Sequence, residues 1–456
     1  MCGIAGYVGK GDVVTALLEM LVELQHRGQE HAGIAIATNT HAIERVNGGW
    51  NVVEMILNRS RIPRVNGAFG GVGHVRYSTS GGYLNSVTQP AVVGGDFKIA
   101  LAFNGTIANY RALAKEVGIK PENDTQAFAN VLLKYSIEYG KDVVEALKAL
   151  ASRVVGGYSV IVVTNEPRIV LARDPRGFRP LAYGFNGGEF YAASETAVLD
   201  IVGVESWREV RAGEVVSFDG HSLEVMAAQA VGEATPCVFE YVYFSRPDSI
   251  FNGVSVYESR VLMGMELAKV APAEADVVVP IPDSGRAAAI GYSRASGLPM
   301  DEGVVANKYI GRGFIMPPTV RDSLSSLKYG FVKKVVNGRR VVLVDDSIVR
   351  GTTMKSLVSK LRRFGAREIH VRVASPPFRY PCFMGIDVSS RNELLAWSKM
   401  RLEDIAKALG ADSIAYNPVE CLIRSVGSSA VCTACFTGRY PFKNLTVEDL
   451  ESMFSR

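Results

Sequence analysis

The stretch VVLVDDSIVRGTT, residues 341–353, decides the fold of the second half of the chain. Its four leading apolar residues predict a buried strand, and the small and hydroxyl residues after Asp346 predict a turn that opens a helix. Two adjacent carboxylates, Asp345 and Asp346, are costly at the buried end of a strand unless something pairs with them. We therefore expect them to meet ribose hydroxyls and a divalent cation, with the backbone N–H groups of residues 347–353 around a phosphate. A strand followed by a capped polar helix is the plainer alternative.

The first residues of the chain predict a second kind of chemistry. CGIAGYVG, residues 2–9, reads as an apolar strand that begins with a cysteine. Removal of Met1 would leave Cys2 with a thiol and a free α-amino group on one carbon. An α-amino group has a pKa of about 7.7–8, so near neutral pH it can take the proton of the nucleophile. A first strand with an incidental thiol is the alternative.

Loops farther along the first half carry groups that such a thiol needs. Arg76 is suited to a carboxylate and Asp124 to an α-ammonium group, which together specify an amino acid. Asn104 and the N–H group of Gly105 are suited to a developing oxyanion. Each residue also has an ordinary alternative: Arg76 as a surface cation, Asp124 as a helix N-cap, and the Asn-Gly pair as a hairpin turn.

Four of the six cysteines suggest a metal centre. Cys432 and Cys435 form a C-x-x-C pair, and Cys237 and Cys382 each lie beside aromatic residues. Disulfides are not expected in a long cytoplasmic chain. A four-thiolate site would suit an iron–sulfur cluster or tetrahedral zinc, and unliganded buried thiols are the third possibility. Cys421 fits no motif and is expected to be a buried thiol.

The composition is that of an ordinary globular protein. The 456 residues are enough for two domains of about 200 residues each. Lys and Arg number 50 against 46 Asp and Glu, and no basic block is dense enough to indicate nucleic acid or an anionic membrane as partner. No apolar run approaches the roughly 18–20 residues that span a bilayer, and the first residues lack the layout of a secretion signal. We therefore expect a cytoplasmic protein.

Motifs of the first half resemble the class II glutamine amidotransferase domain, an N-terminal-nucleophile hydrolase. They are CGIAGYVG at 2–9, HRGQEHAG at 26–33, GHVRYST at 73–79, FNGTIANY at 103–110, RDPRGFRPL at 173–181 and SET at 194–196. The resemblance implies a glutamine site made of Cys2 as nucleophile, Asn104 and Gly105 as oxyanion hole, Arg76 and Asp124 on the glutamine backbone groups, and Arg27 and Gly28 shaping the pocket. Two departures stand out: Phe103 replaces the usual His, and NDTQ at 123–126 replaces Ser-Asp-Thr-Glu.

The run at 341–353 resembles the phosphoribosyl pyrophosphate signature of the type I phosphoribosyltransferases. With it comes VVVPIPDSGRAAAIGYS, residues 277–293, another strand, turn and helix. The resemblance implies that phosphoribosyl pyrophosphate is bound by Ser284, Gly285, Asp345, Asp346, Ser347, Arg350, Gly351, Thr352 and Thr353, and Mg²⁺ by Ser284, Asp345 and Asp346. Residues 307–328 carry the cations Lys308, Arg312, Arg321 and Lys328 and are expected to close as a lid over the anionic substrate.

The two halves together resemble the amidophosphoribosyltransferase family, and YVYFSRPDSIFNGVSVYESR at 241–260 resembles its domain junction. The implied fold, α/β and α+β, is a four-layer αββα sandwich over residues 2–235 followed by a type I phosphoribosyltransferase α/β domain over 236–456. The implied enzyme hydrolyses glutamine at Cys2 and channels ammonia to 5-phosphoribosyl 1-pyrophosphate. The products would be 5-phosphoribosylamine, glutamate and pyrophosphate, in the first step of de novo purine biosynthesis.

The resemblance is to the iron–sulfur-containing branch of this family. It implies a 4Fe-4S cluster on Cys237, Cys382, Cys432 and Cys435, purine nucleotide inhibitors, and a homo-oligomer, either dimer or tetramer. Two rival interpretations stay open. One is a class II amidotransferase with a different acceptor domain, against which the run at 341–353 argues. The other is a degenerate homologue that binds phosphoribosyl pyrophosphate or nucleotides in a regulatory role.

Overall fold

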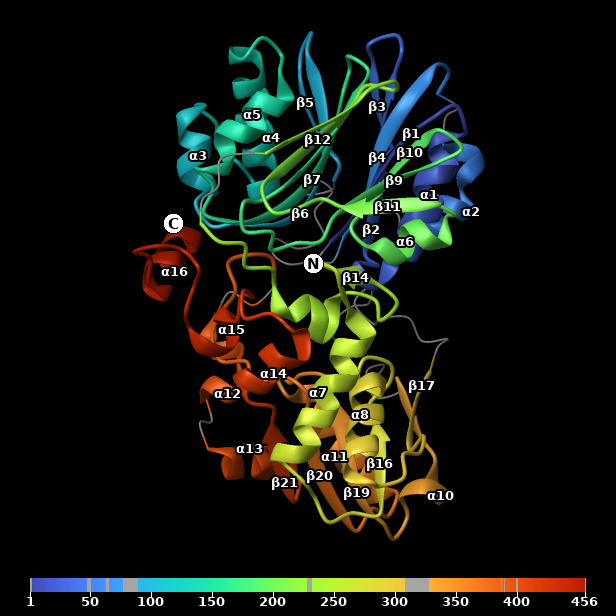
Figure 1. The fold of residues 1–456 in the computed structure, drawn as a ribbon, viewed down its shortest axis with the longest axis vertical. Helices are drawn as coiled ribbons and strands as arrows, with labels where there is room; N and C mark the ends of the chain where they lie inside the picture. Colours follow the sequence, from blue (N-terminus) through green and yellow to red (C-terminus); the bar gives the residue numbers. More distant parts are fainter. Residues whose placement is uncertain are drawn as a thin grey trace.

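The structure, a computed structural model, describes residues 2–46, 51–62, 65–76, 89–227, 232–307, 328–386, 388, 390–398 and 401–455. Two halves lie one above the other along the long axis, and the beginning of the chain is marked at the boundary between them (Figure 1). Most of the expected lid, residues 308–327, lies outside the described residues, as do residues 77–79 of the GHVRYST motif.

The first half consists of two antiparallel sheets that pack face to face. The seven-stranded sheet has the order β11-β9-β10-β1-β4-β2-β3, and the six-stranded sheet has the order β13-β12-β8-β7-β6-β5. Their strands are β1 Gly3–Val8, β2 His31–Thr38, β3 Ile43–Val46, β4 Ala68–Arg76, β5 Ala91–Gly94, β6 Lys98–Ile107, β7 Gly156–Thr164, β8 Arg168–Arg173, β9 Ala182–Asn186, β10 Glu189–Ala193, β11 Ser206–Glu209, β12 Glu214–Phe218 and β13 Leu223–Ala227.

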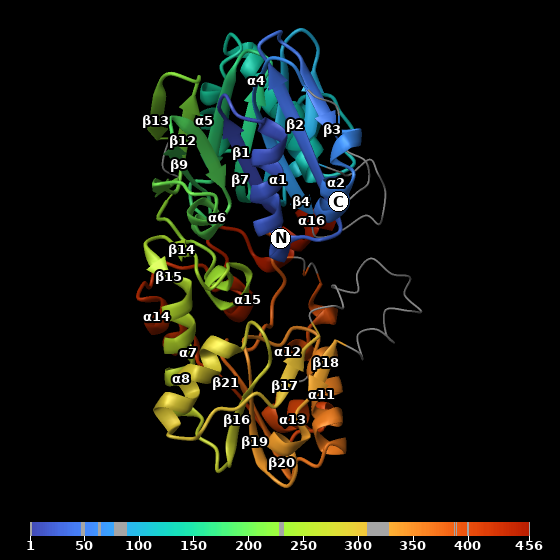
Figure 2. The same ribbon diagram turned by 90° about the vertical axis from the view of Figure 1, so that its right-hand side faces the viewer.

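Helices cover the outer face of each sheet (Figures 1 and 2). The seven-stranded sheet carries α1 Val13–Glu23, α2 Val52–Leu57 and α6 Thr196–Ile201, and the six-stranded sheet carries α3 Tyr110–Glu116, α4 Asp124–Glu138 and α5 Val143–Ala151. Side chains alternate along β1, so that Ile4 and Val8 pack between the sheets while Ala5 and Tyr7 pack beneath α1. The expected four-layer αββα sandwich is confirmed.

The second half is an α/β domain with a parallel sheet in the order β16-β19-β20-β21. Its strands are β16 Val277–Pro280, β19 Arg340–Asp345, β20 Glu368–Val373 and β21 Ser413–Tyr416. One face of the sheet is covered by α7 Val256–Val270, α8 Arg286–Ser296 and α14 Val419–Val426. The other face is covered by α11 Thr352–Arg363 and α13 Leu402–Leu409. The shorter elements are β14 Ile250–Phe251, β15 Val254–Ser255, β17 Val304–Ala306, β18 Tyr329–Phe331, α10 Lys333–Val336, α12 Leu395–Ser398, α15 Ala434–Thr437 and α16 Val447–Ser455. The expected phosphoribosyltransferase α/β fold is confirmed.

The segment between the halves bonds to both of them. The backbone N–H of Thr235 donates to Arg176 in the first half, at 2.8 Å. The carbonyl of the next residue, Pro236, accepts from Cys432 near the end of the chain, also at 2.8 Å. Residue 235 thus bonds to the first half and residue 236 to the end of the chain. A domain boundary between residues 235 and 236 stays a prediction.

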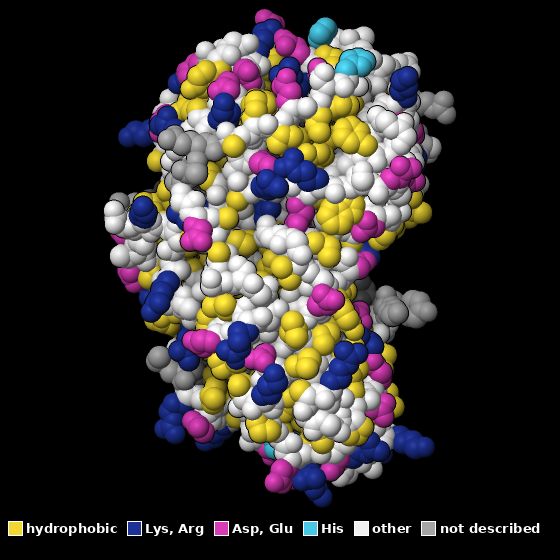
Figure 3. All heavy atoms as spheres, viewed as in Figure 1, with side chains coloured by type: hydrophobic (Ala, Val, Ile, Leu, Met, Phe, Trp, Pro, Cys, Tyr) yellow, Lys and Arg dark blue, Asp and Glu magenta, His cyan; other side chains and the backbone are white. Residues whose placement is uncertain are grey.

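One face of the surface is drawn in Figure 3. On the face drawn in Figure 3, basic and acidic side chains are interspersed. In the described ranges no helix combines the length and the apolar character needed to cross a membrane.

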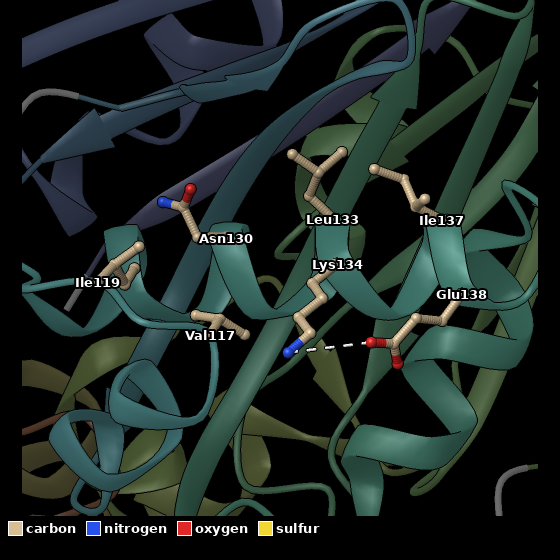
Figure 4. Close-up of a pocket in the computed structure, with 7 residues that line it drawn as sticks. All are labelled: Val117, Ile119, Asn130, Leu133, Lys134, Ile137 and Glu138. Carbon is tan, nitrogen blue, oxygen red and sulfur yellow. Dashed lines mark ion pairs between the residues drawn. The ribbon is translucent and has the colours of Figure 1, made fainter.

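A shallow hollow of about 410 Å³ lies against α4, and none of the residues predicted for either site lines it (Figure 4). Its lining is Val117, Ile119, Asn130, Leu133, Lys134, Ile137 and Glu138.

Candidate active sites and cysteine cluster

Cys2 stands directly before β1, the middle strand of the seven-stranded sheet. Its backbone nitrogen donates to Oδ1 of Asn104 at 3.3 Å. Its carbonyl oxygen accepts from Nε of Arg27 at 3.2 Å. The main chain is therefore held on both sides of the carbon that carries the partly buried thiol.

Asn104 and Gly105 lie in β6 of the opposite sheet, so the hairpin-turn alternative is wrong. Asn104 is fully buried, and its Nδ2 has no hydrogen-bond partner among the described residues. A buried unpaired donor costs about 1–3 kcal/mol, so this nitrogen indicates a ligand oxygen beside Cys2. At Gly105 a Cβ atom would lie 2.0 Å from the carbonyl oxygen of Gly157, so only glycine allows β7 to approach.

Asp124 is the first residue of α4, but it does not cap the helix. The N-cap is Asn123, whose side chain accepts from the backbone nitrogen of Gln126 at 2.8 Å. The Asp124 carboxylate accepts from the backbone nitrogens of Ile107 at 3.1 Å and Thr125 at 2.9 Å. Burial raises its pKa to about 6 in spite of these bonds. A cationic group such as an α-ammonium would restore the charged form.

Arg76 closes β4 and is only 5% exposed, so it is not a surface cation. Its backbone pairs with His31, and its carbonyl oxygen accepts from Glu30 at 3.2 Å. These contacts fix the strand end, while a role on the glutamine carboxylate stays a prediction. Gly28 is buried and donates to Gln25, which ends the turn that carries Arg27.

Arg27 is fully buried between two glutamates that the motif analysis did not assign. Its Nη1 donates to Glu195 at 2.7 Å, and its two terminal nitrogens bind Glu240 at 2.9–3.0 Å. Burial opposes the ionised form of Glu195, but His26 and Arg27 hold its pKa well below the usual value. Among the described residues, the guanidinium contacts Cys2 through its backbone carbonyl oxygen.

Gln89 is a further residue that no motif indicated. Its Oε1 accepts from the backbone nitrogen of Phe103 at 2.7 Å, and its Nε2 donates to Oγ1 of Thr125 at 3.1 Å. The side chain therefore ties the strand of Asn104 to the helix of Asp124. The Phe103 ring packs against Phe128 of α4, at 5.7 Å between centroids, in the core of the helical layer. Phe103, where the family usually has His, thus serves packing in this chain.

The acidic pair of the second half lies where the sequence places it, at the end of β19. The Ser284 side chain favours the ionised form of Asp346 and so lowers its pKa, and Oγ of Ser347 donates to the same carboxylate at 2.5 Å. A Cβ atom on Gly285 would lie 2.7 Å from the carbonyl oxygen of Val344, which shows how closely the turn after β16 covers the strand end. The two predicted motifs thus meet at the carboxyl ends of neighbouring strands.

The surroundings of Asp345 and Asp346 disfavour the negative charge of their carboxylates. Burial raises the pKa of both carboxyls, and for Asp345 the neighbouring Asp346 raises it further. The pair is followed by the turn that leads into α11, where Gly351 has φ of 78° and helix residues Thr352 and Thr353 begin. Arg350 in that turn pairs with Glu393. A divalent cation with oxygen ligands would compensate the two carboxylates.

The four predicted cysteines gather in one buried region. Cys237 and Cys432 pair through their backbones, Cys435 lies in α15, and Cys382 belongs to the same core cluster. Burial raises the pKa of Cys237 to about 11, and it also raises the pKa values of Cys432 and Cys435, with further contributions from the charges of the other thiols. Cys421 lies apart on α14 beside Arg424.

The four thiols form a donor set suited to metals that prefer sulfur. In the part of the chain that the structure describes, no group of three His, Cys, Asp or Glu side chains is positioned to hold a metal ion. Thiolates serve both tetrahedral zinc and iron–sulfur clusters. The identity of a metal centre at these four cysteines stays a prediction.

Comparisons with known proteins match both halves of the chain. A glutamine amidotransferase domain matches residues 74–200, and a phosphoribosyl transferase domain matches residues 260–375. Amidophosphoribosyltransferase of Pyrococcus horikoshii is 45% identical over 96% of both chains, and that of Bacillus subtilis is 38% identical over 96% of this chain and 94% of the relative.

Two solved structures cover nearly the whole chain. The glutamine phosphoribosylpyrophosphate amidotransferase of Bacillus subtilis, complexed with ADP and GMP, has a TM-score of 0.86 at 35% identity and covers 98% of this chain and 100% of its own. A structure described as the allosteric regulatory enzyme of purine biosynthesis has a TM-score of 0.88 at 36% identity, with 99% of each chain covered.

Fold and sites together define a glutaminase joined to a phosphoribosyltransferase. The chain belongs to the amidophosphoribosyltransferase family, whose enzymes carry out the first step of purine biosynthesis. A class II amidotransferase with another acceptor domain is thereby excluded.

Proposed function

We propose that Cys2 is the nucleophile of the glutamine half-reaction and that its own α-amino group, freed by removal of Met1, accepts the thiol proton. The sulfur attacks the side-chain amide carbon of glutamine, and the resulting oxyanion is bound by Nδ2 of Asn104 and the N–H of Gly105. Collapse of this intermediate expels ammonia and leaves a glutamyl thioester, which water hydrolyses to glutamate. The observation that carries this proposal is the buried, unpaired Nδ2 of Asn104 beside Cys2.

The glutamine backbone groups are assigned by charge. Asp124 receives the α-ammonium group, because a carboxylate with a raised pKa gains most from a cationic partner. Arg76 receives the α-carboxylate through its planar guanidinium. Arg27 and Gly28 shape the pocket through the position of Cys2, whose carbonyl oxygen accepts a hydrogen bond from Arg27.

The second half-reaction takes place at the end of β19. Ser284, Gly285, Asp345 and Asp346 bind the pyrophosphate and ribose of phosphoribosyl pyrophosphate, and the turn containing Ser347, Arg350, Gly351, Thr352 and Thr353 binds its 5-phosphate. Ser284, Asp345 and Asp346 would hold Mg²⁺, which when bound neutralises charge on the pyrophosphate. Ammonia attacks C1 of the ribose, pyrophosphate leaves, and a proton lost from nitrogen completes 5-phosphoribosylamine. Ammonia reacts only unprotonated, which favours its transfer inside the protein.

We further propose that the four buried thiols hold a 4Fe-4S cluster, as in the iron–sulfur-containing branch of the family. Cys237, Cys382, Cys432 and Cys435 would ligate it as thiolates, whose charge the cluster compensates. They join the segment between the halves, the phosphoribosyltransferase half and the C-terminal tail at one centre. The proposed role is structural.

Other assignments rest on family membership alone. The Bacillus subtilis relative is described as complexed with ADP and GMP. On that basis purine nucleotides are proposed as inhibitors of this enzyme, which is proposed to act as a cytoplasmic homo-oligomer, a dimer or tetramer.

Comparing the two nitrogen sources tests the proposal. Anaerobically purified protein is assayed for glutamate release that depends on phosphoribosyl pyrophosphate, and for pyrophosphate release with glutamine or with concentrated ammonium. Cys2→Ser is expected to lose glutamine use almost completely and to keep synthesis from ammonium, while Cys421→Ser keeps both. Equal loss of both activities in Cys2→Ser would refute the two-site assignment. An unmodified protein without either activity would favour a regulatory homologue.

A further inference from the structure

The nucleophile position depends on a residue from beyond the first half of the chain. Glu240 opens the π-helical turn Glu240–Phe244, which directly precedes the phosphoribosyltransferase elements. Its carboxylate binds both terminal nitrogens of Arg27 at 2.9–3.0 Å, and Nη1 of Arg179 at 3.0 Å. The side chains of all three residues are completely buried. An acidic group from the junction thus lies next to the arginine that holds Cys2.

Cys2 needs such support because of its place in the chain. If the proposed function is correct, Cys2 is the first residue of the mature protein and has no preceding peptide bond to restrain it. Its two anchors are then the contact of its nitrogen with Asn104 and the hydrogen bond from Nε of Arg27 to its carbonyl oxygen. The orientation of the Arg27 guanidinium therefore helps to fix the main chain from which the thiol projects.

Arg27 is held from two sides. Glu195, from the first half, contacts Nη1 alone, whereas Glu240 contacts both terminal nitrogens. A bidentate contact fixes the plane of a guanidinium, and a single contact leaves it free to turn about that bond. Glu240 is therefore the partner that sets the direction of Nε toward Cys2.

The turn that carries Glu240 is itself held by the second half. Arg260 of α7 donates to the carbonyl oxygens of Tyr241 and Ser245, both at 2.7 Å. Oγ of Ser245 in turn donates to Glu240 at 2.9 Å. The position of the carboxylate is thus fixed from the phosphoribosyltransferase side.

We propose that Glu240 is a positioning residue for the glutamine half-reaction, acting across the junction through Arg27 on the Cys2 main chain. The proposal rests on Cys2 being the nucleophile. It assigns to the junction a part in glutamine chemistry, although Glu240 itself touches no substrate.

Glu240→Gln keeps the size of the side chain and removes its charge. We expect kcat with glutamine to fall on the order of 10- to 100-fold, because a small displacement of a nucleophile has effects of that size. The KM for glutamine and the ammonium-dependent rate are expected to change less than about threefold, since neither the Asp124 region nor the second site is altered. Alkylation of Cys2 by a diazoketone analogue of glutamine, followed by intact mass, should slow in parallel with kcat.

Two further variants complete the test. Ser245→Ala removes one hydrogen bond from Glu240 and keeps both charges; it should lower kcat with glutamine several-fold without unfolding the protein. Glu266→Gln, which removes a carboxylate of α7 paired with Lys269 of the same helix and with Arg424 of α14, is the control and should change neither activity. Parallel loss of glutamine and ammonium activities, or unchanged glutamine kcat in both Glu240→Gln and Ser245→Ala, overturns the positioning role. Glutamine activity that survives in Cys2→Ser overturns the proposed function instead.

Discussion

Asn104 binds the Cys2 backbone nitrogen through Oδ1, at 3.3 Å, and keeps Nδ2 buried without a partner in the described part of the chain. In the proposed mechanism, one side chain therefore orients the nucleophile and presents a donor to the atom that becomes an oxyanion. Because the Cys2 nitrogen donates to Oδ1, Nδ2 is the atom left to donate to a ligand. On this proposal the glutamine site holds its oxyanion donor in place before substrate is bound.

Replacing Asn104 tests this donor. Asn104→Ala is expected to lower kcat with glutamine by about 10²- to 10³-fold, the usual effect of losing one oxyanion donor. The ammonium-dependent rate should be unchanged, since the second site is not touched. Asn130→Ala, at a partly buried position of α4 where the side chain donates to Gln126, is the control. A glutamine rate reduced less than threefold would mean that Nδ2 is not the oxyanion donor.

Asp124 predicts a pH dependence. Its pKa is raised to about 6, and it must be ionised to receive an α-ammonium group. We therefore expect kcat/KM for glutamine to have an acidic limb near pH 6, separate from the limb at about 7.7–8 that belongs to the α-amino group of Cys2. Asp124→Asn should raise the KM for glutamine about 10- to 100-fold, as expected for a lost contact to a charged group, and remove the acidic limb. A limb that persists in Asp124→Asn belongs to another group.

The paired aspartates predict effects on both stability and activity. Burial raises both pKa values above 3.8, so the folded protein binds protons more tightly than the unfolded chain and loses stability as pH rises above about 4. Asp345→Asn with Asp346→Asn removes this loss. In chelator, the double variant should melt above the unmodified protein at pH 8 and close to it at pH 4.

The same double variant should lose phosphoribosyl transfer from either nitrogen source. Mg²⁺ with phosphoribosyl pyrophosphate should raise the Tm of the unmodified protein only, because bound ligand stabilises the folded state. Calorimetry and the ammonium assay measure these effects. Retained ammonium activity would show that the pair does not bind the substrate.

Local sequence was enough to predict the elements that carry both sites. The apolar run before Asp345 is β19, and the apolar run that begins at Cys2 is β1, because each strand signal lies within a few consecutive residues. The partners of Arg27 could not be predicted in this way, since Glu240 lies 213 residues away and a buried ion pair has no periodicity. The role of Gln89 could not be predicted for the same reason, because its two hydrogen bonds join a strand and a helix that only the fold brings together.

The cysteine cluster allows a decisive chemical test. Cys237, Cys382, Cys432 and Cys435 are buried together, and burial disfavours the thiolates unless a metal centre compensates their charge. Cys432→Ser is therefore expected to give colourless, poorly soluble protein, although Cys432 lies in neither substrate site. Cys421→Ser, which changes a buried thiol outside the cluster, should remain coloured, soluble and active. Iron and sulfide analysis of anaerobically purified protein should find about four irons per chain. One zinc per chain would identify a structural zinc site, and soluble, active protein without metal would show that the four thiols are unliganded.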